Sequence, residues 1–169
     1  MLVGFSLPHA VADELDPLFE RLQSVDAAEY QPIEQKIWRE WSKSGSPAMD
    51  LLLKRGEEAM EAGDLVKAIE HFTALTDHAP EFAQGFHARA TAYYRSEKYG
   101  PALADIEVAL SLEPRHFGAM TGLAVIFEEL GYEAEALEVY YEVRAIHPHR
   151  ENLSETIDRL EKATAGQQL

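Results

Sequence analysis

Residues 83–116, AQGFHARATAYYRSEKYGPALADIEVALSLEPRH, are the middle one of three consecutive units that share a length of 34 residues. Three columns define this period, and each occurs once per unit. The columns are a proline (Pro80, Pro114, Pro148), an alanine (Ala68, Ala102, Ala136) and a large apolar residue four positions after the alanine (Phe72, Ile106, Tyr140). Three independent columns with one period indicate an internal repeat, with units at 49–82, 83–116 and 117–150.

Each unit predicts two helices joined by a turn. In the first helix, apolar or small residues stand at the fourth, eighth and eleventh positions of the unit, which is the stripe of an amphipathic helix. These residues are Leu52, Gly56 and Ala59, then Phe86, Ala90 and Tyr93, then Met120, Ala124 and Phe127. Turns are predicted at Gly63-Asp64, Glu97-Lys98 and Gly131-Tyr132. The proline ends the second helix, because proline cannot continue a helix.

The period, the small residues and the closing proline together resemble the tetratricopeptide repeat (TPR) family over residues 49–150. The resemblance implies an all-α fold, a right-handed superhelix of antiparallel helix pairs with a C-terminal capping helix. Glycine or alanine at the eighth position and alanine at the twentieth let two helix backbones approach closely. The sequence departs from the family where tryptophan is usual, since Leu52, Phe86 and Met120 stand there.

Residues 13–48 continue the frame backward as an N-terminal helical hairpin or a degenerate repeat. In this frame Trp38 and Trp41 fall on the anchor positions of a second helix, so we expect both to be largely buried. The sequence Ser44-Gly45-Ser46-Pro47 predicts a helix end and a new helix start, with the glycine after one helix and the proline first in the next. The alternative is an unrelated helix pair that packs on the first repeat.

Residues 151–169 predict a capping helix followed by a tail. Leu153, Ile157 and Leu160 form one apolar stripe, which would cover the last repeat and leave a polar outer face. The helix is predicted over 151–163, and residues 164–169 are predicted to be disordered.

Residues 1–12, MLVGFSLPHAVA, are uncharged and mostly apolar. Ala10-Val11-Ala12 has the small-x-small form of a signal-peptidase site, although a basic region is missing before it. We interpret this stretch as a signal-peptide remnant, which predicts a periplasmic protein. A frayed apolar end is the other interpretation, and it would leave the protein in the cytoplasm.

Composition narrows the classes of function. The net charge of −15 argues against nucleic acid, whose phosphates require Lys and Arg. The chain contains no cysteine, and no run of 18 apolar residues predicts a membrane span. None of the seven histidines has the spacing of a helical metal pair, and no set of residues has the pattern of a catalytic site. We therefore expect no enzyme, no cofactor and no metal.

The resemblance places the binding site on the inner face of the superhelix, which the first helix of each repeat forms. Carried onto this sequence, the candidate site residues are Leu53, Glu57, Met60, His87, Thr91, Tyr94, Arg95, Val125, Glu128 and Glu129. The middle repeat is neutral, with four acids and four bases, and its two neighbours are acidic. This pattern predicts a protein or peptide ligand with apolar anchors and flanking Lys or Arg. The predicted function is a scaffold or adaptor in the bacterial cell envelope, and the alternative is a cytoplasmic secretion chaperone.

Two further expectations concern single positions. TPR domains that hold a C-terminal carboxylate use Lys, Asn and Arg at five fixed positions, but Leu53, Glu57, Ala88, Gly118 and Gly122 stand there in this chain. The resemblance therefore implies that the carboxylate clamp is absent. Arg89 and Asp105 fall on facing helices of the middle repeat, and a partly buried guanidinium needs a partner, so we expect them to pair.

Overall fold

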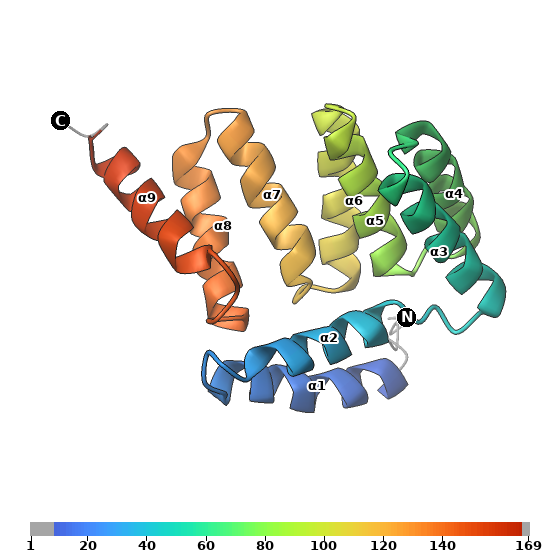
Figure 1. Cartoon of the computed structure of the whole chain (residues 1–169), viewed down its shortest axis with the longest axis horizontal. Coiled ribbons are helices and arrows are strands. Elements are labelled where there is room, and N and C mark those ends of the chain that lie inside the picture. Colours follow the sequence, from blue (N-terminus) through green and yellow to red (C-terminus); the bar gives the residue numbers. More distant parts are fainter. Residues whose placement is uncertain (1–8, 167–169) are drawn as a thin grey trace, which may run out of the picture.

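The computed structural model describes residues 9–166, and this part of the chain contains nine helices and no strand (Figure 1). The helices are α1 (His9–Ser24), α2 (Tyr30–Trp41), α3 (Pro47–Glu61), α4 (Leu65–His78), α5 (Ala83–Arg95), α6 (Tyr99–Leu112), α7 (Phe117–Glu129), α8 (Glu133–Ile146) and α9 (Leu153–Gly166). The all-α fold predicted from the repeat is confirmed.

The three repeats are the antiparallel pairs α3–α4, α5–α6 and α7–α8. Each second helix also packs on the first helix of the next repeat, as α4 does on α5 and α6 does on α7. Helix α5 contacts both α3 and α7, whereas α4, α6 and α8 hardly contact one another. The first helices therefore line the inner face of a helical-repeat superhelix, and the second helices form its outer layer.

The turns inside the repeats share one residue with a left-handed backbone conformation. Gly63, Glu97 and Gly131 occupy the same position in successive repeats, and all three have positive φ angles of 78°, 58° and 81°. A glycine adopts this left-handed conformation without a side-chain penalty, but Glu97 does not. The predicted turns are confirmed, and the middle one carries backbone strain.

The small residues of the repeat set the distance between paired helices. A Cβ atom added at Gly56 on α3 would lie 2.2 Å from Cε1 of Phe72 on α4, which no pair of atoms tolerates. Ala90 and Ala102 are buried at the equivalent crossing of α5 and α6. Close backbone approach therefore brings the apolar stripes of both helices into contact, and most of the stability of such short helices comes from this packing.

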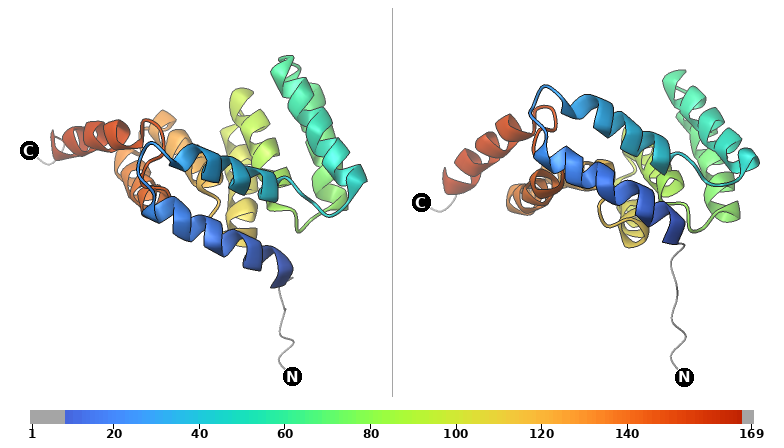
Figure 2. Two further views of the ribbon diagram at one scale, coloured as in Figure 1. Left: turned by 60° about the horizontal axis from the view of Figure 1, so that its bottom comes forward. Right: turned by 90° about the horizontal axis from the view of Figure 1, so that it is seen from below.

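The N-terminal hairpin of α1 and α2 does not continue the repeat stack. Helix α2 makes almost no contact with α3, while α1 packs on α8. The hairpin lies crosswise along one end of α5, α7 and α8, as the views from below show (Figure 2). Residues 13–48 therefore form the helical hairpin that was one of the two expectations. The degenerate repeat in register is wrong, and so is the alternative of a helix pair that packs on the first repeat.

Both tryptophans are covered, for a reason different from the one expected. Trp41 is only 6% exposed and Trp38 is half-buried. Their rings pack on Phe117, at the start of α7 in the third repeat, and not on the first repeat, which follows α2 in the sequence. The helix start after Gly45 is confirmed, because Gly45 has a φ of 80° and Pro47 begins α3.

At the C-terminal end, α9 covers the last repeat with Leu153, Ile157 and Leu160, all of them buried. The prediction of a capping helix is confirmed, but it continues to Gly166, so the expected disorder from residue 164 on is wrong for residues 164–166. Residues 1–8 and 167–169 lie outside the described part, and α1 begins at His9, within the stretch interpreted as a signal remnant.

Candidate protein-binding groove

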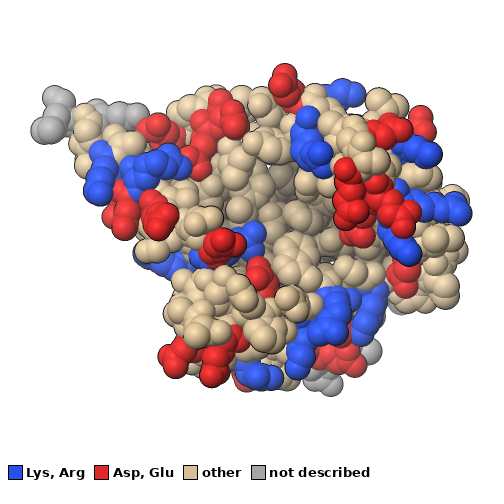
Figure 3. Space-filling model, in the orientation of Figure 1, with Lys and Arg blue, Asp and Glu red and all other residues tan. Residues whose placement is uncertain are grey.

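The inner face of α3, α5 and α7 forms a hollow that faces the viewer in Figure 3. The surface inside the hollow is mostly uncharged. Groups of acidic side chains flank it on both sides, over α3 on the right and over the upper ends of α7 and α8 on the left (Figure 3). Helix α2 of the hairpin borders the hollow from below.

On α3, the three candidate residues differ in how much surface they offer. Leu53 is 3% exposed and belongs to the core between α3, α4 and α5, so it offers a ligand almost nothing. Glu57 is exposed, and partial burial of its carboxyl, together with the neighbouring Glu61, raises its pKa. Met60 is half-buried, and its backbone oxygen accepts a 3.0 Å hydrogen bond from Nη1 of Arg95.

On α5, Tyr94 and Arg95 connect the two sides of the groove. The Tyr94 hydroxyl donates to Oε1 of Glu129 on α7 at 3.4 Å, while Arg95 donates to α3. Thr91 is half-buried one turn before, and its hydroxyl donates to the backbone oxygen of His87. These contacts hold the three inner helices together across the candidate surface.

His87 lies at the hairpin end of the groove, where Trp38 covers it. The centroids of the two rings are 5.7 Å apart, and the centroid of the His116 ring lies 4.6 Å from that of His87 and 5.6 Å from that of Trp38. Burial lowers the pKa of His87 to about 4, with a smaller contribution from Arg150, so the ring is neutral near pH 7. His87 is therefore half-buried, and the side of its ring toward Trp38 and His116 is already occupied within the chain.

On α7, Val125 is half-buried, Glu129 is exposed and Glu128 is committed to the fold. Glu128 accepts a 2.8 Å hydrogen bond from the hydroxyl of Tyr140, and it pairs with Arg159 on the capping helix. The pairing ties α7 to α9, so Glu128 has a structural role that the sequence did not indicate.

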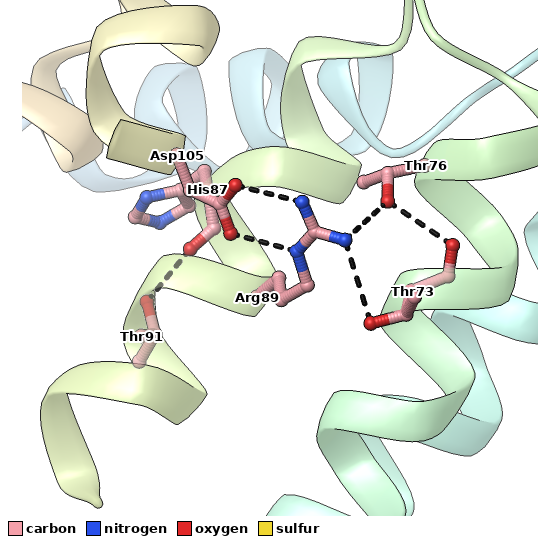
Figure 4. A network of polar contacts seen from close by, with 6 residues as sticks. All are labelled: Thr73, Thr76, His87, Arg89, Thr91 and Asp105. Atoms are coloured by element: carbon pink, nitrogen blue, oxygen red, sulfur yellow. Dashed lines mark hydrogen bonds and ion pairs between the residues drawn. The ribbon is translucent and has the colours of Figure 1, made fainter. Parts of the chain in front are cut away.

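Arg89 and Asp105 form the predicted pair behind the groove (Figure 4). Nε and Nη2 of the guanidinium donate to the two carboxylate oxygens at 2.7 and 2.8 Å, and Nη1 donates to the hydroxyl of Thr76 at 2.7 Å. Thr76 belongs to the preceding repeat, so the network joins α4, α5 and α6. The bond to Asp105 raises the pKa of Arg89, which stays charged.

The sequence did not indicate the residues of the repeats that contact the hairpin. Trp41 stacks on His116 with ring centroids 4.1 Å apart, and Arg150 lies over the Phe117 ring at 5.2 Å. Gly118 carried a signal, because a glycine at the second position of a helix on the inner face leaves room for a neighbouring ring. Among the side chains that the structure describes, from Glu14 to Gly166, no three or more potential metal ligands lie together, and none of the helices described has the length and hydropathy of a membrane span.

The comparisons with known proteins agree with this architecture. The family model for the tetratricopeptide repeat matches residues 87–151. A TPR repeat-containing protein of Rhizobium etli is 30% identical over 153 residues, which cover 90% of this chain and 75% of that protein. The chain belongs to the tetratricopeptide repeat family.

Solved structures show the same fold. The TPR2B domain of yeast Sti1, in complex with pHsp70, is 25% identical and has a TM-score of 0.63, with 72% of this chain and 99% of that chain covered. The MamA protein is 16% identical, with a TM-score of 0.64, and the match covers 94% of this chain and 85% of that one. The MamA match therefore extends beyond the three repeats.

Proposed function

We propose that this protein is a non-catalytic scaffold that binds a protein or peptide segment in the groove formed by α3, α5 and α7. The observation that carries the proposal is the mostly uncharged hollow with acidic side chains on both sides (Figure 3). A ligand segment with apolar anchors and flanking Lys or Arg complements both features. Its apolar residues would bury area in the hollow, and its cations would be steered by the acids.

Tyr94 is the residue that we expect to contribute most to binding. It lies half-buried at the centre of the inner face, between Thr91 and Glu129. A central aromatic side chain buries a large area at a small loss of side-chain freedom, which is the usual property of residues that dominate interfaces.

The proposed ligand is an internal segment rather than a chain terminus. The Sti1 domain binds pHsp70, but this chain lacks the basic and amide residues that hold a terminal carboxylate in such domains. Glu57 and Glu61 on α3, and Glu129 on α7, would repel a free carboxylate at the flanks of the groove.

For location we propose the bacterial cell envelope, with a secretion chaperone in the cytoplasm as the alternative. The proposal rests on the signal-like residues 1–12. Cleavage after Ala12 would remove the first turn of α1, which begins at His9. The intact mass of the protein from its native source separates the two locations, because an envelope protein begins at Asp13 and a chaperone retains Met1.

Capture of the partner from the native organism, followed by calorimetry, tests groove binding. Tyr94→Ala should weaken binding by about 1–3 kcal/mol without loss of helicity, and Tyr94→Phe should retain most of the affinity because the ring remains.

Reversal of Glu57 and Glu61 to Lys should slow association, and raised salt should have the same effect. Glu138→Lys on α8 is the control, because this residue is exposed on the outer layer. Wild-type affinity in the groove variants, with loss of binding in the control, would contradict the proposal.

A further inference from the structure

The N-terminal hairpin packs on the repeats through a contact in which a side chain of one fits a gap in the other. Trp38 is inserted against Gly118 of α7, where an added Cβ atom would lie 2.5 Å from Cη2 of the indole. The indole also meets the Phe117 ring edge-on, with ring centroids 5.5 Å apart and planes at 89°. Only glycine at residue 118 leaves space for this ring, so the surface of α7 is complementary in shape to Trp38.

Charges on the two sides of this contact are complementary. The repeats supply arginines and the hairpin supplies acids, as Arg115 donates to Asp16 at 2.7 Å and Arg150 donates to Glu34 at 3.2 Å. The guanidinium of Arg115 also lies 4.2 Å from the ring centre of Phe19 on α1. Arg115 complements α1, and Arg150 complements the acidic residue of α2. The position of Arg150 therefore favours a helix that carries a carboxylate near its aromatic residues over a purely apolar one.

The contact between the hairpin and the repeats contains buried polar atoms without hydrogen-bond partners, unlike the rest of the described core. All the buried side-chain atoms without a hydrogen-bond partner in the described residues belong to Trp41 and His147, which both lie at this boundary. Trp41 Nε1 has no partner, and His147 has only Oε1 of Glu34, 3.5 Å from its Nε2. Buried polar atoms are normally paired in stable cores, and water would satisfy these atoms if the hairpin moved away.

Neighbouring features also permit separation. A cleft of about 410 Å³ lies between α2 and the turn that joins α8 to α9, and its lining includes Tyr30, Glu34 and Arg150. Helix α2 hardly touches α3, so the hairpin is held to the first repeat by the short connection at residues 42–46. The pairs α3–α4 and α5–α6 therefore do not depend on the hairpin for their packing. The hairpin does share a buried apolar core with α7, α8 and α9, to which Leu22, Ile37 and Trp41 belong, so its release would expose this surface.

We propose that one set of residues forms a second docking surface, separate from the binding groove, and that a partner can displace α2 from it. We call this surface the hairpin seat, and it consists of His87, His116, Phe117, Gly118 and Arg150. The partner that it fits is a protein helix of the same chemistry as α2. Such a helix carries two indoles three positions apart, as in Trp38 and Trp41, and a carboxylate one turn before the first indole, as in Glu34. It would replace α2 on the repeats and use the same ring contacts and the same arginine.

The two tryptophans of the chain both lie on α2, so intrinsic fluorescence reports whether α2 is seated. Gly118→Ala should shift the emission to longer wavelength and increase quenching by acrylamide, with unchanged helicity. Gly122→Ala is the matched control, since it makes the same change one turn along α7, where the nearest atom to the new Cβ is Cδ1 of Ile106 at 3.6 Å. Identical fluorescence in the two variants would overturn the proposed seat.

Binding in trans is tested on the full chain with a fluorescein-labelled peptide of residues 13–43. The peptide should bind the Trp38→Ala/Trp41→Ala variant at least tenfold more tightly than the wild type, in which the resident hairpin competes. Adding Gly118→Ala to that variant should abolish the gain, and a peptide with alanine in place of both tryptophans should not bind. Equal binding to all proteins, or no binding to any, would overturn the proposal. A wild-type dimer in light scattering that Gly118→Ala abolishes would also overturn it, because a second copy would then occupy the surface.

Discussion

Arg55 and Arg89 occupy the same position in successive repeats, and their surroundings differ completely. Arg89 is bonded to Asp105 and to a threonine of the preceding repeat. Arg55 lies exposed on α3, on the face that no preceding repeat covers, and His71 stands where Asp105 stands in the middle repeat. The same residue therefore has a structural role in one repeat and a solvated one in the other.

Arg89→Ala should destabilise the fold by about 3–5 kcal/mol, because it leaves the carboxylate of Asp105 buried without its partner. Arg55→Ala is the matched control and should change the free energy of unfolding by no more than about 0.5 kcal/mol. Urea unfolding followed by circular dichroism measures both. Equal losses in the two variants would show that the network contributes nothing beyond a surface arginine.

Glu97 is the non-glycine member of a column in which Gly63 and Gly131 have the same left-handed backbone. Glu97→Gly should stabilise the protein by about 0.5–1 kcal/mol, since relief of the left-handed strain exceeds the flexibility gained by the unfolded chain. Gly63→Ala, at a site with no atom within 4 Å of the new Cβ, should destabilise by about 1 kcal/mol. Thermal unfolding of the two variants should therefore move in opposite directions.

At the scale of elements, the position of the hairpin depends on neutral histidines. Nδ1 of His116 accepts a hydrogen bond from the backbone N–H of Ala119, and its Nε2–H therefore donates to Oε1 of Gln84 at 3.0 Å. Burial lowers the pKa of His116, with smaller contributions from His87 and Arg150. Burial, with a smaller contribution from Arg150, lowers the pKa of His87 to about 4. A proton on His116 would remove the acceptor that caps α7 and add charge beneath two indoles.

Acid should therefore release the hairpin. When α2 leaves, His87 and His116 return toward the ordinary histidine pKa of about 6.5, so the released state binds more protons below that pH. Docking should be fully stable above about pH 6.5 and should weaken as the pH falls toward 4, where His87 contributes about 1.4 kcal/mol per pH unit and His116 acts in the same direction. Glu34 faces the same boundary, and its lowered pKa, caused mainly by the adjacent His147, keeps it charged over most of this range.

Tryptophan emission recorded between pH 8 and pH 4.5 measures this release. His87→Gln should reduce the shift in emission, and His78→Gln is the control because His78 is exposed at the end of α4. An emission maximum that stays constant until the helices melt would rule out the histidine mechanism.

At the scale of the whole molecule, the groove and the hairpin seat share one end. His87 was predicted as a groove residue, and the structure places it beneath Trp38. A groove ligand that extends as far as His87 therefore meets the hairpin, while one that ends at Tyr94 does not. The length of the bound segment decides whether the two surfaces are coupled.

Much of the fold could be predicted from the sequence, because it depends on short-range chemistry. The 34-residue period, the glycine and proline positions and the apolar stripes determined the helix pairs, the turns and the capping helix within residues 49–166. The pair of Arg89 and Asp105 was also predictable, because two antiparallel helices in one repeat bring these positions together.

Only the tertiary structure decided where the hairpin lies and which candidate site residues are accessible. The frame placed Trp38 and Trp41 on anchor positions, yet their helix α2 packs on residues far along the chain. Trp38 meets Phe117 at the start of α7, and Glu34 pairs with Arg150, 116 positions away. Leu53 and Glu128 match inner-face positions, but one enters the core and the other binds α9. Periodicity determines which residues share a helix face. Which surface then covers that face depends on shape and charge complementarity between distant segments, which no local pattern contains.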